Sequence, residues 1–191
     1  MKTFLIFYLI FIWCPKGWAQ NDLGLKAIEI LASSELSIKG DTNISEFGCV
    51  FNTIYLEECR EVIYKKNGND INFSNAVLSL KNKGFDCGNK AINKDFHSLL
   101  KTKTYPIITL ELTKITLTGQ KIGEARVKIM IAGAKREYMV PVAILSEPTN
   151  RFVGKLKLDI KDFNLEPPKK MFGLIVIKEK IEIDFKLVAK L

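Results

Sequence analysis

Asp95 and His97 are the residues whose types and spacing come closest to a catalytic pair. His97 is the only histidine in the chain. A histidine oriented by an acid serves as a base in many hydrolases, but such a site also needs a nucleophile. No Gly-x-Ser-x-Gly turn surrounds a serine, and the adjacent acids Glu57 and Glu58 would point to opposite faces of a strand. The sequence therefore predicts no enzyme, and we expect His97 to be structural or to neighbour a ligand's head group.

The cysteines indicate a disulfide rather than a metal site. Three of the four, Cys49, Cys59 and Cys87, lie beyond the N-terminal segment. An oxidising compartment would permit one disulfide and leave one thiol. Cys59 could face Cys49 across a hairpin. Cys49 and Cys87 each follow a phenylalanine by two residues, Phe47 and Phe85, so each shares a strand face with it, and we favour a Cys49–Cys87 pair.

No pattern in the sequence indicates a metal or a cofactor. There is no Cys-x-x-Cys pair of the kind that binds zinc. A glycine-rich phosphate loop and a His-Glu-x-x-His motif are also missing. We therefore expect neither a metal nor a cofactor.

The first twenty residues are typical of an export signal. The unbroken apolar run Phe4–Trp13 is shorter than the roughly 17–25 residues of a membrane-spanning helix. Gly17 and Ala19 supply the small residues that precede a cleavage site. We expect a signal peptide at residues 1–19, a mature chain that begins at Gln20, and a periplasmic or secreted location.

The charge pattern excludes one class of partner. The formal net charge is +8, and removing residues 1–20 removes two lysines and no acid, which leaves +6. Lysines alternate with acids along most segments, and no arginine cluster with interleaved aromatics is present. This pattern does not favour nucleic acid. An anionic membrane surface stays open as a peripheral partner, and nothing in the sequence indicates an oligomeric state.

The remaining chain is dominated by alternation of apolar and polar residues. In the last segment, Ile181, Ile183 and Phe185 share one face, and charged residues occupy the other. A period of two is that of a half-buried strand. The same alternation recurs in residues 108–112, 127–131, 138–144 and 152–160, with short turns between the segments. About eight or nine strands with short connections, in one domain over residues 21–191, predict an antiparallel sandwich or an up-and-down barrel.

One segment has a helical period instead. Residues 90–101 place four apolar side chains on one side: Ile92, Phe96, Leu99 and Leu100. Asn89 is of a type that caps a helix N-terminus, and Pro106 ends any continuation. We expect one short helix at about residues 90–101.

The inward faces of the strands have two interpretations. A barrel of about eight strands has an interior that side chains just fill or that holds one small ligand, and periodicity alone leaves both open. We expect the following residues to line that interior: Phe47, Phe51, Ile108, Leu110, Leu112, Ile129, Ile131, Val140, Val142, Leu156, Leu158, Ile181, Ile183 and Phe185.

Five segments, taken in order, resemble the YceI-like family. In Lys94–Leu112, a basic residue, Asp95 and His97 precede a strand that begins with Tyr-Pro-x-Ile, as in that family. Residues 36–51 resemble the family's opening strand pair, and residues 128–144 its strand–glycine turn–strand unit. Two later segments, 154–168 and 175–190, resemble its Asp-Phe strand and its closing strands.

The resemblance implies a lipocalin-like antiparallel β-barrel that is exported to the bacterial periplasm or beyond. It also implies that a long apolar lipid, an isoprenoid quinone or a polyprenyl-type molecule, binds inside the barrel without catalytic machinery. The alternative is a filled barrel that acts as a structural or interaction protein of the cell envelope.

Overall fold

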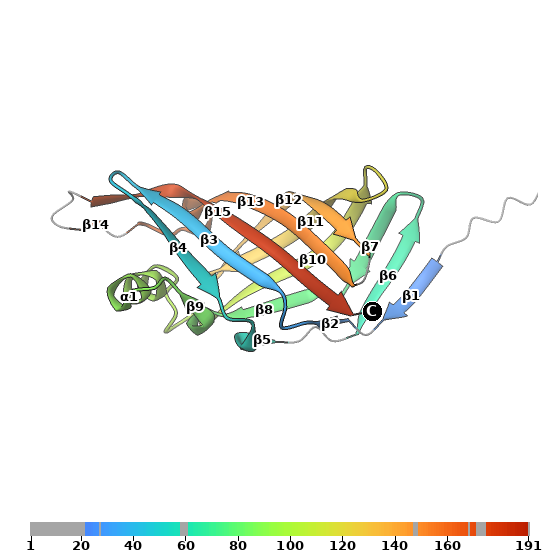
Figure 1. The fold of residues 1–191 in the computed structure, drawn as a ribbon, viewed down its shortest axis with the longest axis horizontal. Helices are drawn as coiled ribbons and strands as arrows, with labels where there is room; N and C mark the ends of the chain where they lie inside the picture. The colour runs from blue at the N-terminus through green and yellow to red at the C-terminus, as the bar shows by residue number, and fades with distance from the viewer. Residues whose placement is uncertain are drawn as a thin grey trace, which may run out of the picture.

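The alternating segments form the strands of one antiparallel sheet that curls into an elongated barrel (Figure 1). The computed structural model describes residues 22–26, 28–57, 61–146, 149–167, 169–170 and 175–190. Within them the single α-helix is α1 (Lys90–Leu99), at one end of the barrel. The prediction of an all-β, lipocalin-like fold with one short helix is confirmed, whereas the expected export signal lies outside the described residues.

The sheet combines long and short strands. The long strands are β3 (Glu35–Thr42), β4 (Glu46–Phe51), β10 (Ile107–Leu117), β11 (Ile122–Ile131), β12 (Ala134–Leu145), β13 (Asn150–Asp159) and β15 (Ile175–Lys190). The short strands are β1 (Asp22–Lys26), β2 (Glu29–Ile30), β5 (Leu56–Glu57), β6 (Val62–Asn67), β7 (Asp70–Ser74), β8 (Val77–Lys81), β9 (Phe85–Asp86) and β14 (Lys169–Lys170). Within the described residues, the 3₁₀ turns η1 (Thr53–Tyr55), η2 (Asn82–Gly84) and η3 (Ile160–Phe163) connect some of them.

One segment, Val77–Asp86, joins the two ends of the sheet. Its first part, β8, pairs with residues 107–111 of β10. Its last part, β9, follows η2 and pairs with β4 through Phe85 and Phe51. Counted around the barrel, the wall is therefore β3, β4, the β8–β9 segment, β10, β11, β12, β13 and β15, in agreement with the predicted number of about eight.

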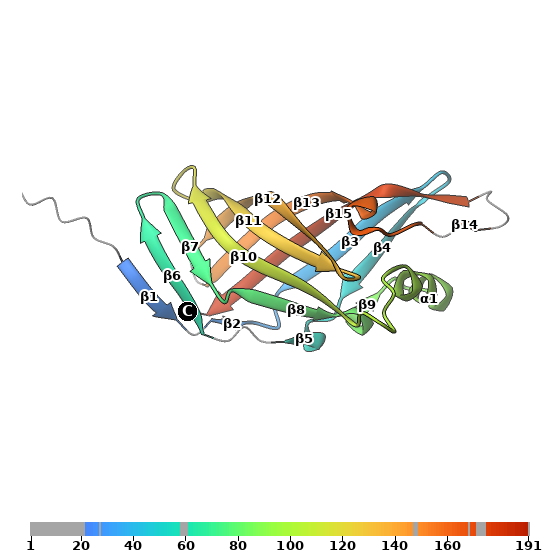
Figure 2. The ribbon, with the colours of Figure 1, turned by 180° about the vertical axis from the view of Figure 1, so that it is seen from behind.

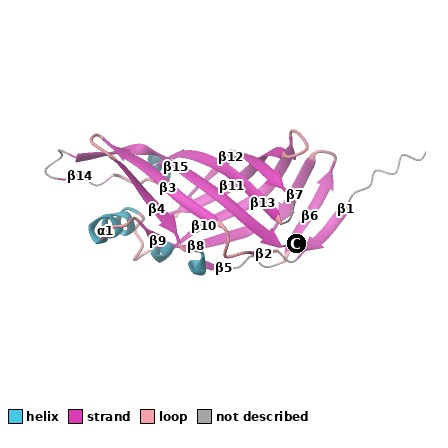
Figure 3. Cartoon of the chain, viewed as in Figure 1, coloured by secondary structure: helices cyan, strands magenta, loops and turns pink. Residues whose placement is uncertain are grey.

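Strand β10 changes its partner along its length (Figure 2). A register shift between Leu112 and Lys114 separates the part that pairs with β8 from the part that pairs with β7. Strands β7, β6 and β1 then extend the sheet at the end of the barrel opposite α1 (Figure 3). The bulge at this position allows one strand to serve both the barrel wall and this extension.

Ion pairs link neighbouring strands on the outer face of the wall. Lys39 lies 2.7 Å from Asp184, and Lys155 lies 3.2 Å from the same carboxylate. The hydrogen bond from Lys39 keeps the pKa of Asp184 below its usual value, so this carboxylate stays charged at neutral pH. Such exposed pairs contribute little stability individually, but they balance charge along the wall.

The helix begins where the sequence analysis placed it and ends slightly earlier. Asn89 Oδ1 accepts hydrogen bonds from the backbone N–H groups of Ala91 and Ile92, as expected of an N-cap. Against the expected range of about 90–101, the helix ends at Leu99, and Lys101 has a φ of 52°, so the chain leaves the helix there. No helix among the described residues is long and apolar enough to cross a bilayer.

A disulfide joins Cys49 of β4 to Cys87, which lies between β9 and α1. This is the pairing that the sequence analysis favoured, and Cys49 is completely buried. Cys59 lies outside the described residues. The bridge ties the base of the helix to the barrel wall.

We expect the Cys49→Ala/Cys87→Ala variant to lose about 2–4 kcal/mol of unfolding free energy, because the bridge closes a long loop in the unfolded chain. Urea unfolding followed by circular dichroism measures this loss. Cys59→Ala is the control and should unfold as the wild type does. An unchanged urea midpoint for the wild-type protein in reductant would contradict the prediction.

Candidate functional site

The barrel encloses a cavity of about 690 Å³ whose lining is almost wholly apolar. Every residue that the sequence analysis expected to face inward lies on its wall: Phe47, Phe51, Ile108, Leu110, Leu112, Ile129, Ile131, Val140, Val142, Leu156, Leu158, Ile181, Ile183 and Phe185. The barrel is therefore hollow rather than filled, which periodicity had left undecided.

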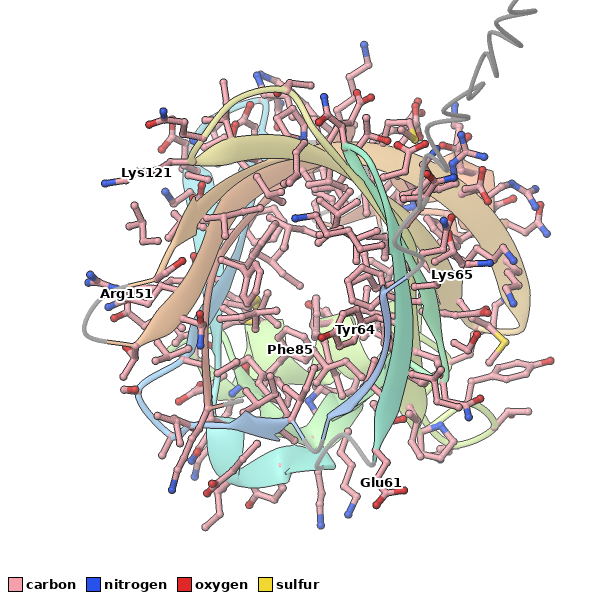
Figure 4. The ribbon with its side chains drawn as sticks, turned by 90° about the vertical axis from the view of Figure 1, so that its right-hand side faces the viewer. Glu61, Tyr64, Lys65, Phe85, Lys121 and Arg151 are labelled. Carbon is pink, nitrogen blue, oxygen red and sulfur yellow. A yellow bond between two sulfur atoms is a disulfide. The ribbon has the colours of Figure 1, made fainter. Side chains whose placement is uncertain are left out.

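Alternation along each strand produces this lining. On β11, Ile129 and Ile131 are 2% and 7% exposed, whereas Met130 between them is 39% exposed. Figure 4 looks into the barrel from the end opposite α1 and shows the same rule on β6, where Tyr64 points inward and Lys65 outward. Because successive side chains of a strand point to opposite faces, a strand of the wall presents every second residue to the cavity.

Two phenylalanine rings rest against glycines on neighbouring strands. Phe185 is the cross-strand partner of Gly154, and Phe47 is the partner of Gly40. A Cβ atom at either glycine would overlap the ring of its partner. Glycine at these two positions lets the rings lie on the wall, which leaves the middle of the barrel free.

Helix α1 presents one face to the cavity. The lining residues from the helix are Ala91, Ile92, Asp95, Phe96 and Leu99, which share one side at about 100° per residue. Phe96 packs against Phe85 with ring centroids 5.3 Å apart. None of the ten helical residues is fully buried, so the helix borders the cavity without sealing it.

The structure separates the two residues that suggested catalysis. Asp95 lines the cavity, whereas His97 is not among the lining residues. His97 lies on the opposite side of α1 together with Lys90 and Lys94, at about 100° per residue. The two side chains therefore do not share a site. The helical period of the sequence already places Asp95 on the side of the apolar stripe and His97 on the other side.

The cavity opens beside α1. Apart from Glu35, the cavity-lining residues that are exposed to solvent lie in three places: the hairpin between β3 and β4, α1, and the start of β15. They are Ile44, Ser45, Glu46, Ala91, Ile92 and Lys178. Asn43 fastens the hairpin tip to β15, because its N–H donates to the carbonyl of Val176 and its Oδ1 accepts from the N–H of Val176. We call this opening the mouth.

A smaller polar cleft of about 360 Å³ adjoins the cavity between α1 and the turn after η3. It is lined by Asp95, Ser98, Leu99, Lys101, Asn164 and Glu166. Asp95 and Leu99 also line the apolar cavity, so the two spaces share a wall. A ligand with an apolar tail and a polar head would find both environments side by side.

Several lining residues come from irregular segments and were not among those expected to line the interior. Phe163 of η3 is completely buried, and Leu165 after it is 2% exposed. Phe85 stands in the two-residue strand β9 and is 3% exposed. Strands and turns this short carry too few residues for a period to be read. The helix face was visible in the sequence, but its orientation toward the barrel was not.

The described residues contain no group of three or more His, Cys, Asp and Glu side chains that could hold a metal ion. The ionisable groups that stand out are on the wall instead. Tyr138 donates a hydrogen bond of 2.8 Å to Asp162, and burial together with this acid raises the pKa of Tyr138. This pair anchors η3 to β12.

An antiparallel barrel around an apolar cavity, with a helix beside its mouth, defines a lipocalin-like barrel. The chain belongs to the YceI-like family, because the family model described as "YceI-like domain" matches residues 32–189. No curated protein matches the sequence.

Solved structures share the fold at low sequence identity. The crystal structure of Burkholderia cenocepacia BcnA is 21% identical with a TM-score of 0.68, over 83% of this chain and 98% of that one. A polyisoprenoid binding domain from Saccharophagus degradans, implicated in plant cell wall breakdown, is 14% identical with a TM-score of 0.58, over 86% and 98% of the two chains. At these identities the likeness concerns the fold.

We expect Gly154→Ala to push the ring of Phe185 off the wall and into the cavity, because a Cβ there overlaps this ring and also meets the carbonyl oxygen of Pro141 at 2.8 Å. The cost in stability should be about 1–3 kcal/mol, as for other overpacked sites. Thermal melting measures it. Gly48→Ala is the control, since its Cβ would meet nothing closer than Ile38 O at 3.7 Å. Equal losses for the two variants would contradict the prediction.

Proposed function

We propose that this protein is an exported carrier that sequesters a long isoprenoid-type lipid, such as a quinone or a polyprenyl lipid, inside the barrel. The observation that carries the proposal is the apolar cavity of about 690 Å³. That volume lies within the roughly 300–1,000 Å³ of small-molecule sites. An apolar cavity of this kind holds water poorly and favours an apolar occupant.

The tail supplies most of the affinity in this proposal. Each methylene moved from water into such a lining contributes about 0.8 kcal/mol. A tail of several isoprene units can therefore bind tightly without any dedicated polar contact. The Saccharophagus domain, which is named for polyisoprenoid binding and has the same fold, supports this choice of ligand class.

The polar head of the ligand belongs at the α1 end of the cavity. Asp95 lines both the apolar cavity and the polar cleft, where Ser98 and Lys101 add further polar groups. His97 faces away with Lys90 and Lys94 and has no direct part in head-group binding in this proposal.

Export completes the proposal. The apolar run and the small residues before Gln20 support a signal peptide at residues 1–19. The Cys49–Cys87 disulfide is consistent with an oxidising compartment such as the periplasm. A binding role, rather than catalysis, agrees with a site made almost entirely of aliphatic and aromatic side chains.

Leu110→Asp should abolish retention of a fluorescent polyprenyl or quinone analogue, because an unpaired carboxylate in this lining is strongly unfavourable. Thr109→Asp, on the opposite face of the same strand, is the control and should retain the analogue. Fluorescence after gel filtration measures retention, and thermal melting establishes that each variant is folded. Full retention by a folded Leu110→Asp variant would refute the carrier proposal.

Ile131→Phe tests the cavity without introducing charge. The larger side chain takes up space in the lining, so we expect weaker binding of long-tailed analogues than of short ones. Met130→Phe places the same ring on the outer face and should bind both analogues as the wild type does. If both variants show the same difference in affinity between long-tailed and short-tailed analogues, the tail does not bind in the cavity.

His97→Ala should leave tail retention close to that of the wild type, since His97 does not line the cavity. The same fluorescence assay decides this point. Suppose that this variant loses the analogue while Leu110→Asp and Ile131→Phe retain it. That result would favour a site on the outer face of α1 and argue against the carrier proposal.

A further inference from the structure

The end of the barrel that carries α1 concentrates positive charge. The segment Lys81–Lys103 holds six lysines and two aspartates, a formal net charge of +4. On the helix, Lys90 and Lys94 are both exposed and lie on the side opposite the cavity-facing stripe. The helix is therefore amphipathic, with an apolar face toward the cavity and a positively charged face toward solvent.

Lys90 and Lys94 differ in their partners from most lysines of the barrel wall. Most wall lysines lie beside acids on neighbouring strands, as Lys39 does with Asp184, Lys135 with Glu111 and Lys186 with Glu35. Within the described part of the chain, neither Lys90 nor Lys94 forms an ion pair. Charge on the wall is thus largely balanced locally, whereas the charges of Lys90 and Lys94 are available to an anionic partner.

Exposed apolar side chains accompany this charge. Ile54, Ile44 and Val50 are 79%, 68% and 63% exposed, the largest values among the exposed large hydrophobic residues. Val50 is the register partner of Asp86 in the lysine-rich segment, and Lys83 lies over the ring of Tyr55, next to Ile54. Ile44 stands at the mouth itself. Figure 1 shows the tip of the hairpin between β3 and β4 at the same end of the barrel as α1.

We propose that the α1 end, defined by residues 81–103 with Ile44, Val50 and Ile54, is a docking surface for an anionic phospholipid bilayer. Lysines next to projecting apolar side chains match the two layers of such a surface, in which anionic head groups cover a hydrocarbon interior. An acidic protein would satisfy the lysines but offers no general reason for the apolar side chains. The mouth opens at this end, so docking would bring the cavity to the bilayer.

This inference goes beyond the proposed carrier function and can be tested without any cargo. Delipidated protein is mixed with phosphatidylcholine vesicles that contain or lack phosphatidylglycerol, and the bound fraction is measured by sedimentation. We expect binding that requires phosphatidylglycerol and weakens as salt is added. Failure to sediment with either kind of vesicle would overturn the docking proposal while leaving the analogue assay, and hence the carrier proposal, untouched.

The charge is tested with Lys90→Gln/Lys94→Gln. Each lysine close to an anionic membrane increases the affinity for it about fivefold, so removing both charges should weaken vesicle binding roughly 25-fold. The matched control is Lys65→Gln/Lys66→Gln, which removes the same charge from exposed positions of β6 at the opposite end (Figure 4). Equal loss in both variants would mean non-specific attraction by net charge and would overturn the assignment of the surface.

The apolar contribution is tested with Val50→Ser/Ile54→Ser. These exposed positions should tolerate serine without loss of thermal stability, while vesicle binding that survives added salt should fall. Ile122→Ser/Val153→Ser changes two residues that are 54% and 37% exposed on the outer wall and is the control. Salt-resistant binding that drops equally in both variants, or in neither, would contradict insertion at the α1 end.

Discussion

The cavity depends on the hydrogen bonding of one segment, Val77–Asp86, to two strands that are distant in sequence. Through β8 this segment pairs with β10, and through β9 it pairs with β4. Without both ladders the sheet would have two open edges, and its apolar inner face would meet water along the gap. With both in place, backbone hydrogen bonds fix the separation of the walls. The Cys49–Cys87 disulfide lies directly beside the β4–β9 ladder and reinforces it.

A fixed wall explains how an apolar interior stays hollow. Apolar side chains normally pack until few voids remain, but the strands here cannot approach one another without breaking their ladders. Glycines opposite Phe47 and Phe185 let these large rings lie against the wall. The apolar side chains around the cavity therefore lack packing partners on one side. An apolar ligand bound in the cavity would make the van der Waals contacts that these side chains lack in the empty barrel.

Helix α1 connects the interior to the outside. Its Ile92, Phe96 and Leu99 border the cavity, and its Lys90 and Lys94 face away from it. No residue of the helix is fully buried, and it is tied to the barrel by the disulfide at its base, the contact between Phe96 and Phe85, and hydrogen bonds of Asn93 with Asp86 and Cys87. In the proposed carrier function, a ligand would pass this helix on its way into the barrel.

The sequence by itself determined what depends on local periods. A period of two identified the inward residues of the long strands, such as Ile129, Ile131 and Ile183, and a period of 3.6 identified α1 with its Asn89 cap. These features follow from the geometry of a strand or a helix alone. The disulfide pairing was also favoured by the sequence, since Cys49 and Cys87 each follow a phenylalanine by two residues.

Only the tertiary structure decided what depends on distant segments. The closure by Val77–Asp86 rests on pairing with two separate strands, and a two-residue strand such as β9 has no period to read. That the apolar side of α1, which includes Asp95, faces the cavity depends on how α1 is rotated against the barrel. Whether the barrel is hollow depends on its width and on where each ring rests, and both are set by hydrogen bonds and contacts between residues far apart in the chain.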